Sequence, residues 1–251
     1  MLKAYAQETA GDSPPRVARP ALEQDWLELS FLHWSFPPHS VAVLLPPGVR
    51  IDTFDGDAWV GLVLFRLRIV LRTGLTLPWL CSFPETNVRT YVVGPDGERG
   101  IWFFSLDCAR LVAAWAGRMT YRLPFHHAVM GMDCGDGVRR YRSRRLPRTG
   151  AKSSGCSATV HIGEAIARSR VTSLQAFLTE RWRLYTRAEG GIATAHVEHP
   201  PWRLHHAVAT DVDAGLLAAC GLPYPEGSPL ALAADSVHAR LTGLRACAAR
   251  E

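Results

Sequence analysis

The alternation of side chains between Phe83 and Tyr91 indicates a strand with one unusually polar face. Read with the two-residue period of a strand, that face carries Phe83, Glu85, Asn87, Arg89 and Tyr91. The opposite face carries Pro84, Thr86, Val88 and Thr90. Strongly apolar segments flank the run, so we expect the polar face to line a cavity rather than to face bulk water. The pattern therefore predicts a polar pocket and leaves its reaction open.

Apolar runs elsewhere predict further strands. The longest, residues 58–71, is rich in β-branched and aromatic side chains, which is typical of a central strand. Gly61 inside this run indicates a bulge or the close approach of another group. The turn sequence at 94–97 predicts a hairpin that leads into a strand over 100–106. Other expected strands cover 41–45, 138–145, 158–162 and 192–198.

Three short helices are predicted between the strands. The first follows Ser105 or Asp107, either of which is a suitable N-cap, and ends near Gly117. Its inner side is expected to carry Leu111, Val112, Ala114 and Trp115. The other two helices cover 174–185 and 212–220. Many strands with few short helices favour an α+β protein, mainly β, folded as one domain over residues 21–251.

The composition allows a large core and no membrane span. Of the 251 residues, 47% are hydrophobic, yet no apolar run reaches the roughly 18 residues that a membrane helix needs. Residues 1–20 contain no apolar core of the signal-peptide type and are predicted to be disordered. We therefore expect a cytoplasmic protein with no membrane partner.

The net charge of +5 comes almost wholly from arginine, because only Lys3 and Lys152 are lysines. Such a bias often reflects genome composition, so the basic charge is weak evidence for a nucleic-acid partner. The arginine-rich stretch at 139–148 is accompanied by no recognisable nucleic-acid motif. No nucleic-acid partner is therefore predicted.

The cysteines and histidines lack the spacing of a metal site. The six cysteines include no C-x-x-C pair, so free thiols are expected. His196 and His199 would point to opposite faces of one strand, which argues against a shared metal. No metal and no cofactor are predicted, and a histidine-based metal enzyme is the weaker alternative.

Several short motifs are distinctive in combination. They are Leu32-His33-Trp34, Asp52-Thr53-Phe54-Asp55-Gly56, Glu85-x-Asn87-Val88-Arg89-Thr90-Tyr91, Phe104-Ser105-Leu106-Asp107, Leu178-Thr179-Glu180-Arg181 and His199-Pro200-x-Trp202. Together they resemble the YqjF-like family, a domain of unknown function, over nearly the whole chain. That family is in turn similar to the acetoacetate decarboxylase-like superfamily. The resemblance implies a β-rich, barrel-like domain built around a buried polar pocket.

The resemblance does not carry decarboxylation to this chain. The decarboxylases use a lysine that forms a Schiff base with a keto acid, assisted by a glutamate and an arginine. By the order of elements, Glu85 lies near the decarboxylase glutamate, and the lysine is expected around 123–128. This chain has His126 and His127 there and no lysine.

The polar strand and its expected neighbours supply the candidate site residues. Glu85 and His126 are the candidate acid or base, and Arg89 is the candidate anchor for an anion. The candidate ligand-binding residues are Asn87, Arg89, Tyr91, Tyr141 and Arg145. The last two share one face of the strand predicted at 138–145, from which they would reach the pocket.

The predicted partner is a small-molecule ligand, an organic acid or carbonyl compound, handled without a lysine Schiff base. The alternative is a non-catalytic ligand-binding or structural protein, in which the polar strand is a buried network that fixes strand register. A cavity of roughly 300 Å³ or more would favour a ligand. The oligomeric state, and whether the chain is an enzyme, stay open at this point.

Overall fold

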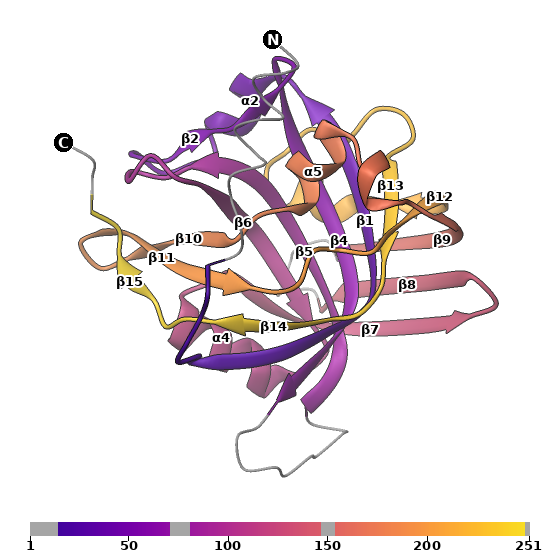
Figure 1. Cartoon of the computed structure of the whole chain (residues 1–251), viewed down its shortest axis with the longest axis horizontal. Helices are drawn as coiled ribbons and strands as arrows, with labels where there is room; N and C mark the ends of the chain where they lie inside the picture. Colours follow the sequence, from indigo (N-terminus) through magenta and orange to yellow (C-terminus); the bar gives the residue numbers. More distant parts are fainter. Residues whose placement is uncertain (1–14, 71–80, 147–153, 249–251) are drawn as a thin grey trace.

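Strands make up most of the molecule (Figure 1). The computed structural model describes residues 15–70, 81–146 and 154–248. Within them, fifteen strands belong to one sheet, which is antiparallel except where β6 pairs with β7 and β10. Of the predicted disordered segment, 1–14 lies outside the described residues. Val17 is buried and its N–H donates to the Glu198 carboxylate, so the last part of this segment packs against the sheet.

Strands and a few short helices follow one another along the described parts of the chain. The longer strands are β1 (Leu22–Phe36), β4 (Asp57–Val70), β5 (Ser82–Val93), β6 (Arg99–Cys108), β7 (Phe125–Gly135), β8 (Val138–Arg145), β9 (Gly155–Ala165), β11 (Gly191–Glu198) and β12 (Leu204–Asp213). The shorter strands are β2 (Arg50–Ile51), β3 (Thr53–Phe54), β10 (Arg183–Ala188), β13 (Leu230–Ala234), β14 (Val237–Leu241) and β15 (Arg245–Ala246). The helices are α2 (Pro38–Ala42), α4 (Leu111–Tyr121), α5 (Ser173–Thr179), α6 (Gly215–Ala219) and the 3-10 helix η1 (Arg168–Arg170).

The sheet closes on itself twice around a shared wall. One ring follows hydrogen-bonded neighbours through β1, β4, β5, β6, β10, β11 and β14 and returns to β1. The other follows β1, β4, β5, β6, β7, β8, β9, β12 and β13. In Figure 1 the β7–β8 hairpin extends to one side of the shared strands, and β10 and β11 lie on the other. Since both faces of the wall are covered, residues 85–92 of β5 are all buried.

The expected fold class, α+β and mainly β with a few short helices, is confirmed, and several local expectations are wrong. A helix, α2, stands where a strand was expected at 41–45. Ser105 and Asp107 belong to β6 rather than capping a helix, because α4 starts only at Leu111. The helix expected over 174–185 ends at Thr179, since the chain turns there to begin β10.

Gly61 marks the close approach that its place in the sequence indicated. It lies opposite His33 in the β1–β4 register, and a Cβ at this position would lie 2.7 Å from His33 Nε2. His33 cannot move away easily, because Nε2 is hydrogen-bonded to the Tyr91 hydroxyl. We expect Gly61→Ala to lower the free energy of unfolding by about 1–3 kcal/mol, measured by urea denaturation.

Gly131→Ala is the matched control for this prediction. Gly131 lies on the exposed face of β7, and a Cβ there would meet nothing within 4 Å. The control should change stability by no more than about 0.5 kcal/mol. Equal effects of the two substitutions would contradict the close-packing explanation.

Candidate functional site

A cavity of about 400 Å³ lies inside the ring formed by β1, β4, β5, β6, β10, β11 and β14. Most of its surface is apolar, with side chains that include Trp26, Phe65, Phe83, Phe103, Leu106 and Leu241. Its polar side chains include Glu85, Asn87, Arg89, Arg181 and His199. Three of these, Glu85, Asn87 and Arg89, come from alternate positions of β5, so this part of the predicted polar face lines a cavity.

Glu85 presents to the cavity a carboxyl group that has no partner among the described residues. The residue is 5% exposed, and no described residue forms a hydrogen bond or ion pair with its side chain. Burial, and secondarily the charge of Asp107, raise the pKa of Glu85 to about 8. At neutral pH the group is therefore a protonated acid that can donate a hydrogen bond into the cavity.

Arg89 is a buried cation that has no carboxylate beside it in the described part of the chain. Its Nη2 donates to the Leu178 carbonyl at 3.0 Å and to the Tyr91 hydroxyl at 3.4 Å, and its guanidinium lies 5.5 Å from the Phe31 ring centroid. No described carboxylate lies within salt-bridge distance of it, and Nε has no partner among the described residues. The neighbouring Asn87 has a buried Oδ1 that is likewise unpartnered among them. A charge buried in this way is costly unless something neutralises it.

Tyr91, the last residue of the polar face, supports Arg89 and does not line the cavity. Its hydroxyl donates to the Leu178 carbonyl at 2.5 Å and accepts from His33 Nε2 at 2.7 Å. Burial, with the charge of Arg89, holds the pKa of His33 well below its usual range, so this histidine is neutral. Phe177 and Leu178 pack over the phenol, so Tyr91 does not reach this cavity, and its ligand-binding role stays a prediction.

Tyr141 and Arg145 lie on the far side of the shared wall. The Tyr141 hydroxyl donates to the Glu28 carbonyl at 2.6 Å, and Arg145 pairs with Asp107 at 2.6 Å. Both side chains belong to the other ring, because β8 pairs with β7 and β9. Neither residue lines the cavity that holds Glu85, and their ligand-binding role stays a prediction.

His126 points away from the cavity. It is exposed on β7, while Phe125, the preceding residue, lines the cavity together with Leu123. Successive strand residues point in opposite directions, so His126 does not line this cavity, and its catalytic role stays a prediction. The segment where the resemblance places the decarboxylase lysine thus contributes leucine and phenylalanine. Lys3 and Lys152 lie outside the described residues.

His199 lines the cavity, although from the sequence it was considered only as a possible metal ligand. Its ring packs among Trp26, Trp182 and Trp202, with centroid distances of 5.5, 4.6 and 4.6 Å. Nδ1 donates to the Pro200 carbonyl at 2.8 Å, which leaves Nε2 as an acceptor. Burial, with the charge of Arg89, lowers the pKa of His199 to about 4. The sequence feature that marks His199 is the His-Pro-x-Trp motif, which does not alternate like a strand and so does not show where the ring points.

Among the described residues, no group of three or more His, Cys, Asp or Glu could hold a metal ion.

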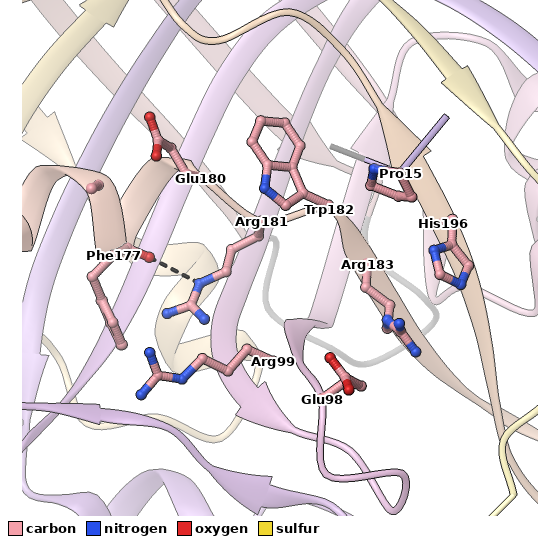
Figure 2. A pocket seen from close by; sticks show the side chains of 10 residues that line it. Pro15, Glu98, Arg99, Phe177, Glu180, Arg181, Trp182, Arg183 and His196 are labelled. Carbon is pink, nitrogen blue, oxygen red and sulfur yellow. Dashed lines mark hydrogen bonds between the residues drawn. The ribbon is translucent and has the colours of Figure 1, made fainter. Parts of the chain in front are cut away.

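Arg181 separates the cavity from a smaller pocket of about 140 Å³ (Figure 2). Figure 2 shows its Nε donating to the Phe177 carbonyl, at 3.0 Å, with Arg99 and Arg183 nearby. Arg181 pairs with Asp52 at 2.9 Å, and Arg183 with Asp96 at 2.7 Å. These two cations are neutralised within the protein, which sets Arg89 apart from them.

Comparison with known proteins agrees with this architecture. Residues 23–238 match DUF2071, a family described as an uncharacterized conserved protein. The chain belongs to this family. It is 31% identical over 210 residues to the uncharacterized protein YqjF of Bacillus subtilis strain 168. This alignment covers 83% of this chain and 85% of YqjF. The resemblance drawn from the motifs is confirmed.

Solved structures share the fold at low sequence identity. The enduracididine biosynthesis enzyme MppR, complexed with pyruvate, has a TM-score of 0.64 and 17% identity over 94% of this chain and 93% of its own. Acetoacetate decarboxylase from Legionella pneumophila has a TM-score of 0.61 and 12% identity over 96% and 95%. These likenesses establish an acetoacetate decarboxylase-like fold. In the described part of the chain, no helix has the length and apolarity needed to cross a membrane.

Proposed function

We propose that the cavity binds a small organic acid, with Arg89 as the anchor for its carboxylate. The observation that carries this proposal is that Arg89, a residue only 8% exposed, lines a cavity of about 400 Å³ with no described carboxylate beside its guanidinium. A ligand carboxylate supplies the missing charge and accepts charge-assisted hydrogen bonds. The pyruvate named with the structurally similar MppR is an acid of this class.

Glu85 and Asn87 are proposed to contact the rest of the ligand. A protonated Glu85 can donate to a carbonyl or hydroxyl oxygen and serve as a general acid. The unpartnered Oδ1 of Asn87 supplies an acceptor between Glu85 and Arg89 on the same strand face. In this proposal the ligand is bound, and any reaction of it takes place, without a Schiff base to a lysine.

Arg89→Met tests the anchor. The substitution keeps the apolar stem and removes the charge, so the affinity for carboxylic and 2-oxo acids should fall about 10- to 150-fold. Binding is measured by isothermal titration calorimetry. In a melting experiment, an acid at a hundred times its Kd should stabilise the wild type by about 2.7 kcal/mol. Because Arg89 has no described ion pair, the unliganded variant should not lose stability.

Arg142→Met is the matched control for the anchor test. Arg142 is exposed on β8, outside the ring that holds the cavity. Its substitution should leave acid binding unchanged. If Arg89→Met unfolds the protein and no acid shifts the melting temperature of the wild type, the polar strand is a structural network and the proposed function is wrong. Any acid that does bind can be incubated with the protein and followed by NMR. Conversion of the acid would show a catalyst, and an unchanged acid would show a binding protein.

A further inference from the structure

We infer that the acid bound by Arg89 carries an extended apolar body, on the order of a dozen heavy atoms in all, which runs along β4 and β5 toward α4. This inference rests on the proposed function and names the substrate class of the same site. Three features of the cavity carry it: its size, the order of its side chains along the wall, and the helix that closes its apolar end.

The cavity is too large for a short keto acid. An apolar cavity of about 150 Å³ holds benzene, which has six heavy atoms. A six-atom acid such as pyruvate would therefore leave more than half of a cavity of about 400 Å³ unfilled. The unfilled part would be bounded mainly by aromatic and aliphatic side chains, which gain nothing from contact with water.

The wall changes from polar to apolar along its length. Along β5 the cavity meets Arg89, Asn87, Glu85 and Phe83 in turn, and along the antiparallel β4 it meets Val63, Phe65, Leu67 and Ile69. Arg89 and Phe83 are six positions apart, which is about 20 Å of strand. A carboxylate held at Arg89 directs the remainder of the ligand past Asn87 and Glu85 to the apolar end.

The apolar end is closed by α4 with small side chains. Ala113, Ala116 and Gly117 line the cavity, and Ala113 packs in the same cluster as Leu67 and Phe83. Larger residues on this face would occupy the space. The bulky side chains of the helix, Leu111, Val112, Trp115 and Met119, are instead 61–64% exposed. The helix therefore leaves room inside for the end of a ligand.

A chain-length series tests the inference on the full protein. Calorimetry with butanoate, hexanoate, octanoate and decanoate should show Kd falling about fourfold for each added methylene group, because each is buried. Ala116→Leu, which fills the apolar end, should remove this gain for octanoate and leave butanoate unchanged. Val112→Leu, on the exposed face of α4, is the control and should alter neither.

The possible outcomes separate the inference from the proposed function. If short acids bind in an Arg89-dependent manner and chain length has no effect, the site binds acids and the inference of an apolar body is wrong. If Val112→Leu weakens octanoate as much as Ala116→Leu does, the apolar end is not where the chain lies, and the inference is again wrong. If no acid binds the wild type, both proposals fall.

Discussion

Asp107→Ala is expected to lower the free energy of unfolding by about 3–5 kcal/mol. Asp107 is fully buried and accepts hydrogen bonds from Arg145 Nε at 2.8 Å, Arg145 Nη2 at 2.6 Å and Ser143 Oγ at 3.0 Å. The substitution leaves the Arg145 guanidinium largely buried without the carboxylate that neutralises it. Urea denaturation monitored by circular dichroism measures the loss.

The control for this prediction is Asp133→Ala. Asp133 also pairs with an arginine of β8, Arg140, at 3.6 Å, but both side chains are more than half exposed. Exposed pairs of this kind contribute little, so the control should cost at most about 1 kcal/mol. A double variant, Asp107→Leu with Arg145→Met, should recover much of the loss, because it removes both charges together. Equal losses for Asp107→Ala and Asp133→Ala would contradict the role of the buried pair.

Arg145 and Arg89 are both largely buried arginines, but they differ in whether a described carboxylate neutralises them. Both guanidiniums lie against β5–β6 of the shared wall, on opposite sides. Arg145 has its carboxylate within the protein, and its neighbours use up the acceptors of Asp107. Arg89 has carbonyl and aromatic contacts but no described counter-ion, and it faces open volume. A largely buried ion pair that is neutralised within the protein therefore lies on one side of the wall, and the cavity that Arg89 lines is on the other.

The strand period predicted which residues of β5 face the same way, and it could not predict which ring a strand would join. Glu85, Asn87 and Arg89 line the cavity together because alternation is a local property of one strand. Whether Tyr141 and Arg145 meet them depends on how β8 pairs, and that is decided by closure of the second ring through β9, β12, β13 and β1. A pattern within one strand carries no information on that closure.

The inner face of α4 was also predicted incorrectly from the sequence, and the reason is physical. The usual expectation places the largest apolar residues inward, which predicted Leu111, Val112 and Trp115 on the inner side. These three are exposed, and the small residues face inward because the helix bounds a cavity instead of filling a core. His199 was not predicted to line the cavity, for a related reason. It follows the end of β11 and is held by Pro200 and three tryptophans, so no periodicity marks it.

Glu85→Gln is expected to change how stability depends on pH. In the wild type the folded chain keeps the Glu85 proton up to a pKa of about 8, whereas the unfolded chain loses it near the ordinary pKa of 4.5. The stabilisation from this proton is fully present below pH 4.5 and is lost as the pH rises toward 8, at about 1.4 kcal/mol per pH unit. The glutamine variant stays neutral throughout, so its stability relative to the wild type should rise by on the order of 4 kcal/mol across that window.

Urea denaturation at pH 5, 6.5 and 8 measures this difference, and Glu164→Gln serves as the control. Glu164 is exposed on β9, so its variant should follow the wild type at every pH. A stability difference between Glu85→Gln and the wild type that does not change with pH would mean that Glu85 is ionised in the folded state. It would then repel a bound carboxylate instead of donating a hydrogen bond. The pH dependence of unfolding therefore tests, without any knowledge of the substrate, whether the cavity holds a neutral acid beside a cation.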